Sequence, residues 1–479
     1  MRRPRIPRKT LVALAACACA AACSTSGGGG TGSSSDGPYS FLGLYRELVE
    51  TNTTLSSGSC TAAAEKVAKR LKEAGYPDED VTVFADPQYP KAGGLVAVLR
   101  GSDPGAKAIA LLAHLDVVEA KREDWQRDPF KLVEENGYYY GRGTNDDKAQ
   151  AAIWADSLIR YRQEGFAPKR SVKLVLTCGE ESGPFNGAKY LVEQKRQLVE
   201  AEFALNEGAE GILDQQGNRV ALGVQAGEKV YQDFTFETTS PGGHSSVPVE
   251  DNAIYRLGAG LERLRAFGFP IQLNEATRAF FASIADLKGG EAAAAIHALL
   301  ADPQDHAAGE RVAKMDPVWN SMLRTTCVAT QLSAGHAPNA LPQRATANVN
   351  CRIFPGVPVQ QVQDTLAGVV ADPQIKISPS GDVSPTPPAP PLDERILGPA
   401  REVAAKLWPG TPLLPTMATG ATDGKYWNAA GIPTYGLSGI FMDPDGDGMH
   451  GLNERVRVRS LGEGRDFLYE AVKLYANAT

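Results

Sequence analysis

A histidine and an aspartate, His114 and Asp116, lie two residues apart in LLAHLDVVEA, directly after a run of small apolar side chains. Acidic residues follow other short apolar runs: Glu180 and Glu181 lie in CGEES, and Glu207 lies in NEG. Imidazoles and carboxylates bind metal ions and transfer protons during catalysis. Their repeated placement after apolar runs therefore indicates a catalytic or metal-binding site.

Positive charge is needed if these groups meet in one cleft. Carboxylates close together repel each other, and burial disfavours their charged forms further. Few basic residues lie near these acids. Only Arg142 and Lys148 flank the aspartates of GRGTNDDKAQ. The expected ligands are His114, Asp146, Glu181, Glu207 and His450. Their three carboxylates carry a charge of −3 and the two histidines are neutral. Two divalent ions would add +4, so the site would keep a net charge of +1. A surplus positive charge lowers the pKa of bound water to about 7 in zinc hydrolases.

Mixed imidazole and carboxylate ligands predict two zinc ions, although cobalt or manganese fits the same set. Asp116 is better placed to orient His114 than to bind metal. A carboxylate two residues along can accept a hydrogen bond from the ring nitrogen that is not used for metal, which fixes the tautomer. For an isolated His-x-Asp pair, an ordinary structural role would be the more frequent explanation.

The elements that position these residues alternate between helix-like and strand-like segments from residue 40 onward. Helical patterns occur at 61–74, before Gly75, and at 147–163. Four short apolar runs predict strands: 95–101, 107–113, 171–177 and 203–206. This alternation predicts an α/β domain with a largely parallel sheet, where reactive groups gather at the carboxyl ends of the strands.

A second, smaller domain is predicted at 226–384, so that the first domain consists of 39–225 and 385–479. Residues 230–237 and the segment RATANVNCRIF alternate apolar and polar side chains, as strands with one buried face do. A helix-like stretch at 252–264 lies between them. The proline-rich segment SPTPPAPP is expected to form a stiff, extended linker that leads back to the first domain.

The N-terminus has the features of a secretory signal. MRRPRIPRK is positively charged, and the apolar stretch after it is too short to span a bilayer. Cys17, Cys19 and Cys23 lie where a bacterial lipoprotein signal places its lipid-accepting cysteine, and we favour Cys23. We predict a signal at 1–23, a flexible tether at 24–38 and a lipid-anchored protein of the periplasm or cell envelope; an ordinary cleaved signal is the alternative.

Composition limits the remaining possibilities. A chain of 479 residues with 43% hydrophobic residues can bury a large core in two or three domains. The net charge of −7 is mild and evenly spread, which argues against nucleic acid as a partner. The cysteines after the signal, Cys60, Cys178, Cys327 and Cys351, show no C-x-x-C pair or regular spacing. We therefore expect no disulfide scaffold, and the sequence predicts no pairing.

Seven blocks, in order, closely resemble one enzyme family: AHLDVV, DPF with GYYYGRGTNDDK, CGEESG, NEG, GGHSSVP, NVNCRIFPG and HGLNER. This is the co-catalytic zinc peptidase family of carboxypeptidase G, carboxypeptidase S, carnosinase, bacterial dipeptidases and aminoacylase. The resemblance runs from about residue 40 to the end. It implies a zinc-exopeptidase-like catalytic domain interrupted by an α+β, ferredoxin-like lid that also serves dimerisation.

The resemblance also implies roles for single residues. One zinc would be held by His114, Asp146 and Glu207, and the other by Asp146, Glu181 and His450. Glu180 would be the general base that takes a proton from water and passes it to the leaving amine. Ala113 stands where the family usually has glycine, which we expect to have no consequence. Dipeptidases and aminopeptidases of the family often have aspartate at the position of Glu207. The glutamate here resembles the carboxypeptidases and acylases instead.

The inserted domain is expected to supply substrate contacts. Arg352 lies on the polar face of its strand, and its guanidinium could bind a carboxylate in bidentate fashion; a solvated sheet face is the alternative. The resemblance implies that His244 donates a hydrogen bond to the oxyanion when the lid closes or from a partner subunit; a structural turn histidine is the alternative. The resemblance also implies that Asn339 and Gly420 match positions that line the substrate's free carboxylate in relatives.

A competing motif is DPDGDGMHGLNE at 443–454, which fits the pattern of a calcium-binding EF-hand loop. Pro444 is awkward inside such a loop, helices are not evident on either side, and His450 falls within it. We therefore interpret its aspartates as part of a turn that presents His450.

Together these features predict an exported two-zinc hydrolase that cleaves the amide bond next to a terminal residue of a dipeptide or short peptide. An N-acyl-amino-acid amidohydrolase is the alternative with the same metal centre. A non-catalytic lipoprotein that binds metal or peptide is the alternative from another class. Glu180 argues against it, because binding alone needs no carboxylate directed at water.

Overall fold

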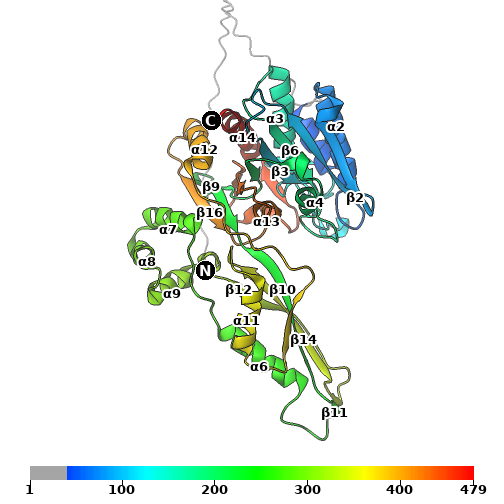
Figure 1. Ribbon diagram of the computed structural model, residues 1–479, viewed down its shortest axis with the longest axis vertical. Coiled ribbons are helices and arrows are strands. Elements are labelled where there is room, and N and C mark those ends of the chain that lie inside the picture. The colour runs from blue at the N-terminus through cyan, green and yellow to red at the C-terminus, as the bar shows by residue number, and fades with distance from the viewer. Residues whose placement is uncertain (1–39, 479) are drawn as a thin grey trace, which may run out of the picture.

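The computed structural model describes residues 40–478, which form a large domain and a slender lid that extends from it (Figure 1). The predicted signal segment with Cys23 and the predicted tether at 24–38 lie outside the described residues. Within residues 40–478, no helix combines the length and the apolar character needed to cross a membrane.

The large domain contains a ten-stranded sheet. Its strands are β1 (Val81–Asp86), β2 (Tyr89–Leu99), β3 (Ile109–His114), β6 (Val172–Thr177), β7 (Phe203–Asn206), β8 (Gly211–Leu213), β9 (Arg219–Glu228), β16 (Leu413–Ala418), β17 (Thr434–Gly436) and β18 (Phe441–Met442). Their order is β1-β2-β6-β3-β7-β17-β9-β8-β18, with β16 beside β9. Strands β6, β3, β7 and β17 run parallel at its centre. The predicted α/β fold with a mainly parallel sheet is confirmed, and the four predicted strands correspond to β2, β3, β6 and β7.

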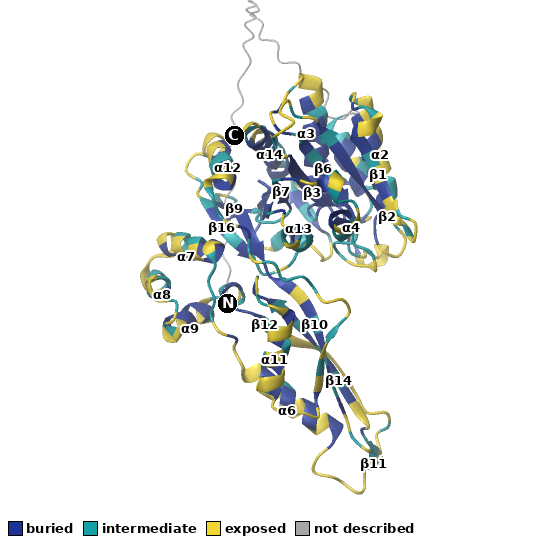
Figure 2. Cartoon of the chain, viewed as in Figure 1, coloured by how far each residue is buried: buried dark blue, intermediate teal, exposed yellow. Residues whose placement is uncertain are grey.

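Helices cover both faces of the sheet because each central strand presents apolar side chains alternately to either side. In β3, Leu111 and Ala113 belong to one buried cluster and Ala110 and Leu112 to another. The first cluster is covered by α1 (Phe41–Val49), α2 (Cys60–Glu73), α3 (Lys148–Glu164), α12 (Glu394–Leu407) and α14 (Val458–Asn477). The second is covered by α4 (Gly187–Gln194), α5 (Arg196–Val199) and α13 (Gly424–Ala429). The central strands are consequently buried on both sides (Figure 2).

The lid has a sheet and a hydrophobic core of its own. Its strands are β10 (Val230–Thr239), β12 (Thr326–Ala334), β14 (Arg344–Ile353) and β15 (Lys376–Ser380), antiparallel in the order β12-β14-β10-β15. The helices α6 (Ala253–Ala266) and α11 (Val359–Val370) pack on one face and bury the alternate side chains of β10 and β14, among them Phe234, Phe236 and Val349. A short pair, β11 (Gly243–His244) and β13 (Ala340–Leu341), lies at the tip, far from the large domain (Figure 1).

Four helices inside the predicted insertion pack elsewhere: α7 (Glu275–Lys288), α8 (Gly290–Ala301), α9 (His306–Met315) and α10 (Pro317–Leu323). Helix α7 contacts β16, and Phe281, Ile296 and Leu323 belong to the core of the large domain. Residues 226–384 therefore contribute to both hydrophobic cores, and the predicted domain boundaries stay a prediction.

All four cysteines in the described part of the chain form disulfides. Cys60 at the start of α2 is bonded to Cys178, which follows β6. Cys327 of β12 is bonded to Cys351, its neighbour across β14. These bonds correct the expectation of no disulfide scaffold: the partners are 118 and 24 residues apart in the sequence, and only the fold brings them together.

Candidate active site

The candidate site lies where three parallel strands end. β3 ends at His114, and Glu207 directly follows β7. Glu180 and Glu181 follow β6 after two intervening loop residues. The order β6-β3-β7 makes these strands neighbours, with His114 opposite Thr177. Carboxyl ends of adjacent parallel strands meet at one edge of a sheet, which brings the three acids to His114.

Asp146 joins two groups of potential ligands. Its Oδ1 lies 3.0 Å from His114 Nε2, which in turn lies 3.5 Å from Glu207 Oε2. Its Oδ2 lies 3.0 Å from His450 Nε2, which lies 3.0 Å from Glu181 Oε2. The structure therefore brings all five predicted ligands together, in two trios that share one aspartate.

The charges of this cluster fit divalent cations. Hydrogen bonds that the His450 ring donates to Asp146 and Glu181 raise the pKa of His450 to about 10. Burial opposes protonation of His114, yet the neighbouring Glu207, Asp116 and Asp146 raise its pKa well above the usual 6.5. The surrounding carboxylates thus stabilise the protonated, positively charged form of both imidazoles. Nitrogen and oxygen donors in such a setting are the ligands that zinc takes.

Asp116 lies beside the His114 ring and also holds the loop after β6. Its carboxylate oxygen lies 3.6 Å from His114 Nδ1, and its backbone carbonyl lies 3.0 Å from the same nitrogen. The carboxylate also accepts hydrogen bonds from the backbone amides of Glu180, at 3.3 Å, and Glu181, at 2.9 Å. Asp116 therefore fixes the loop that carries both acids.

Glu454 is a positioning residue that the sequence analysis considered only as part of a calcium loop. Its buried carboxylate accepts hydrogen bonds from the Arg142 guanidinium at 2.7 Å and from three backbone amides, those of Gly143, Asn145 and Asp146. It thus holds the segment that presents Asp146. Its place in HGLNER, with Arg142 in the earlier block GYYYGRGTNDDK, was the available signal.

The remaining acids of the calcium-like loop are paired with arginines. Arg457 lies 2.6 Å from Asp443, and Arg455 lies 2.7 Å from Asp445. Both arginines belong to β19 (Arg455–Arg457), which forms a small sheet with β5 (Tyr138–Tyr140) and β4 (Val133–Glu135). Since protein cations already balance these carboxylates, the geometry favours a turn that presents His450 over a calcium site.

The four predicted substrate contacts lie in three separate places. His244 and Asn339 meet at the exposed tip of the lid, where the Ser245 amide donates to the Asn339 carbonyl at 3.0 Å. Figure 1 shows that this tip points away from the large domain. Arg352 lies nearer the base of the lid, above the Tyr231 ring at 4.8 Å. Gly420 lies in the exposed loop after β16. A single chain therefore does not bring His244 to the metal ligands.

Two buried acids that the sequence analysis missed anchor the loop containing Gly420. Glu228 at the end of β9 accepts hydrogen bonds from the amide and the hydroxyl of Thr422, at 2.8 and 2.6 Å. Asp423 accepts from the Thr177 hydroxyl at 3.1 Å and from the Asn186 amide at 2.6 Å. Burial raises the pKa of both carboxyl groups. The loop is thereby tied to the same edge of the sheet as the metal ligands.

The Glu228→Gln variant tests this anchor. Burial raises the pKa of Glu228 to about 7, whereas a glutamate in an unfolded chain titrates near 4.3. The folded state therefore holds this proton more tightly, and the wild type loses stability as the pH rises from about 4 to 7. We expect the two proteins to have similar stability near pH 4 and the variant to be more stable at pH 8, by about 3 kcal/mol.

Thermal unfolding at both pH values measures this difference. Glu193→Gln, at an exposed position of α4, is the matched control and should change neither value. Equal stability of Glu228→Gln and the wild type at pH 8 would contradict the assignment.

Comparison with known proteins agrees with the observed fold. Residues 110–474 match the model of Peptidase family M20/M25/M40. The human N-fatty-acyl-amino acid synthase/hydrolase is 27% identical over 435 residues, covering 89% of this chain and 85% of the human protein. A probable carboxypeptidase S-like protein of Dictyostelium discoideum is 28% identical over 393 residues, covering 79% of this chain and 74% of that protein.

Among solved structures, an M20 family metallo-carboxypeptidase from Sulfolobus solfataricus superposes with a TM-score of 0.68 at 18% identity. The superposition covers 91% of this chain and 99% of the other. Because the family model spans most of the described chain and includes every candidate ligand, the chain belongs to Peptidase family M20/M25/M40.

Proposed function

We propose that this hydrolase uses two zinc ions to cleave the amide bond before a C-terminal amino acid of a dipeptide or short peptide. Membership of the M20 family makes it a hydrolase of peptides or N-acyl amino acids. The observation that carries the two-ion proposal is the position of Asp146, whose two carboxylate oxygens each face a different trio. A carboxylate placed in this way can bridge two ions.

Each residue near the centre has a part in the proposed reaction. Zinc ions held by the two trios would polarise the scissile carbonyl and acidify a water molecule. Glu180 accepts the proton of that water during attack and returns it to the leaving amine. Asp116 holds the amides of Glu180 and Glu181, so the base keeps its place beside the ligands.

The lid is proposed to complete the site from a second copy of the chain. His244 lies at the lid tip, and the loop after it exposes Val247 and Val249. The edge strand β12 exposes Val328 and Leu332. Apolar side chains on an unpaired edge strand support contact with another chain. Sedimentation equilibrium that gave only a monomer would contradict this arrangement.

A second candidate function is hydrolysis of N-acyl amino acids. It is favoured by the human relative, whose name describes an N-fatty-acyl-amino acid synthase/hydrolase. The zinc-loaded protein should be tested on dipeptides, C-terminally blocked peptides and N-acetyl amino acids. Release of free amino acid from substrates with a free carboxylate would support the proposed reaction, and the absence of any hydrolysis would contradict it.

Arg352→Ala tests recognition of the carboxylate. Charge-assisted hydrogen bonds contribute roughly 1.5–3 kcal/mol. We therefore expect kcat/KM to fall by about 10- to 100-fold for a dipeptide with a free carboxylate, and by less than about threefold for its C-terminal amide. Arg344→Ala, which removes an exposed arginine from the same strand, is the matched control. Equal losses on both substrates would remove the proposed role.

A further inference from the structure

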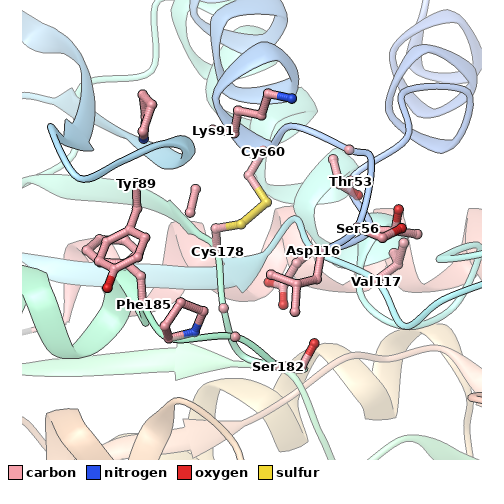
Figure 3. Close-up of a pocket in the computed structure, with 18 residues that line it drawn as sticks. Thr53, Ser56, Cys60, Tyr89, Lys91, Asp116, Val117, Cys178, Ser182 and Phe185 are labelled. Carbon is pink, nitrogen blue, oxygen red and sulfur yellow. A yellow bond between two sulfur atoms is a disulfide. The ribbon is translucent and has the colours of Figure 1, made fainter.

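The disulfide between Cys60 and Cys178 lies beside Asp116, in the wall of a cavity of about 280 Å³. It joins the start of α2 to the loop that follows β6. Figure 3 shows the two sulfur atoms between the Tyr89 and Phe185 rings and the Asp116 side chain. Because both cysteines line the cavity, a small solute inside it comes into contact with the disulfide.

Cys60, Cys178 and Asp116 form a cluster of potential metal ligands that is separate from the two trios sharing Asp146. One sulfur atom of each cysteine and one carboxylate oxygen of Asp116 all lie within 4.8 Å of one another. In the oxidised protein the two sulfur atoms are bonded to each other and hold no metal ion. Thiolates and carboxylates are nevertheless ligands that zinc takes. Once the disulfide is broken, three zinc ligands lie together.

The surroundings of this cluster leave room for an ion. Two thiolates at the usual Zn–S distance of about 2.3 Å lie roughly 3.8 Å apart in a tetrahedral site, so the sulfur atoms must separate after reduction. The Cα atoms of Cys60 and Cys178 are 6.0 Å apart, and rotation of the two side chains can give this separation. The adjoining cavity provides space for the movement and for a water molecule as the fourth ligand.

Breaking the disulfide needs a reductant, and a small dithiol supplies the two electrons. Its thiolate attacks Cys178 Sγ, which forms a mixed disulfide and releases Cys60 as a thiolate. Cys60 is the first residue of the 14-residue helix α2, and a helix N-terminus stabilises a thiolate. The second thiol of the reductant then releases Cys178 and closes into a cyclic disulfide. The two protons of the dithiol pass to the protein thiols, and metal binding releases them to solvent.

An ion at this cluster would compete with the catalytic loop for Asp116. The Asp116 carboxylate accepts the backbone amides of Glu180, at 3.3 Å, and Glu181, at 2.9 Å. One of its oxygens also lies 3.6 Å from His114 Nδ1. A carboxylate that binds a cation is a weaker acceptor for these donors. The proposed base and two of the expected ligands would therefore lose the group that positions them.

We infer that reduction of the Cys60–Cys178 disulfide creates a further metal site, formed by two thiolates and the Asp116 carboxylate, and that an ion bound there inhibits hydrolysis. The ion is a divalent cation that accepts sulfur ligands, such as zinc. Only the inhibition rests on the proposed function, because metal binding can be measured without a substrate. The oxidised protein keeps Asp116 on the catalytic loop, whereas the reduced protein gives it to the ion.

Cobalt binding tests the site without any measurement of activity. The protein is reduced with dithiothreitol, separated from the reagent under nitrogen and saturated with Co²⁺. We expect the reduced protein to hold about one ion per chain more than the oxidised protein. It should also show a thiolate-to-cobalt charge-transfer band, which nitrogen and oxygen ligands alone do not produce. Equal metal content in both forms, or an extra ion without this band, would overturn the inference.

Two variants locate the cobalt band in the molecule. Cys60→Ser removes one of the two thiolates and should abolish both the extra ion and the band. The double variant Cys327→Ser/Cys351→Ser removes the lid disulfide and is the matched control, which should keep both. Any other distribution of the band between the two variants would refute the assignment to Cys60, Cys178 and Asp116.

Hydrolysis in excess zinc tests the inhibition. We expect kcat of the reduced protein to lie about 10- to 100-fold below that of the oxidised protein, because losing groups that orient metal ligands has effects of this size. Oxidised glutathione should restore kcat, and reduced Cys60→Ser should lose less than about threefold. Equal kcat in the reduced and oxidised proteins would refute the inhibition. If neither form cleaved any amide, the proposed function would fail, while the cobalt measurement would still decide the metal site.

Discussion

Glu180→Gln is expected to lower kcat for amide hydrolysis by at least about 10³-fold while both zinc ions stay bound. Glutamine has nearly the same shape as glutamate but cannot accept a proton, and general base catalysis contributes roughly 10²- to 10⁴-fold. The structure places Glu180 outside both trios of ligands, so its loss should not release metal. Steady-state kinetics and metal analysis of the same preparation measure both quantities.

The backbone at this position should survive the substitution. The amide of Glu180, not its carboxylate, is bonded to Asp116, so the loop keeps its anchor. Glu193→Gln, an exposed change on α4, controls for the general effect of replacing a glutamate near the site. If Glu180→Gln turned over at the wild-type rate, Glu180 would not be the base; if it lost metal, it would be a ligand.

His114, Glu181 and Glu207 could be predicted from the sequence because each lies just after a short apolar run. A short apolar run predicts a buried strand, and the polar residue directly after it must lie at the strand's carboxyl end. For His114 and Glu207, this argument alone places both side chains at one edge of the sheet. The two metal trios also depended on the resemblance of whole blocks, because nothing local connects Asp146 to His450.

Contacts between distant segments could not be predicted in this way. Glu454 and Arg142 are 312 residues apart in the sequence, and their side chains come into contact only in the folded protein. The disulfide between Cys60 and Cys178 depends in the same way on α2 lying beside the end of β6. The sequence likewise does not tell which core the helices within 226–384 cover, which is why these residues were expected to form one unit.

The position of His244 shows a further limit of sequence reasoning. A motif can identify the residue type that a reaction needs without telling which copy of the chain supplies it. His244 lies at the far end of the lid, bonded to Ser246 at 2.7 Å. A contribution from a second copy is the simplest arrangement that uses both this histidine and the ligand cluster, and it stays a proposal.

Asp146→Asn is expected to have the second large effect, the loss of both ions rather than of one. Asp146 is the residue that the two trios share, whereas Glu207 belongs to only one of them. An amide is a much weaker zinc ligand than a carboxylate, because it carries no charge. Metal analysis after dialysis should give fewer than one ion per chain for Asp146→Asn, and about one for Glu207→Gln. Hydrolysis should fall by roughly 10⁴-fold in Asp146→Asn.

Comparing the metal content of Asp146→Asn and Glu207→Gln distinguishes a bridging ligand from an acid that only supports the fold. The distinction is possible because the loop around Asp146 is not held by the Asp146 side chain. Glu454 holds that loop through the backbone amides of Gly143, Asn145 and Asp146, which the substitution leaves unchanged. Metal-free Asp146→Asn should therefore keep the native fold, seen as an unchanged circular dichroism spectrum, although it loses the ion pairs of Asp146 with His114 and His450. Two ions retained by Asp146→Asn would show that each trio binds independently, and a two-ion site bridged by Asp146 would then be excluded.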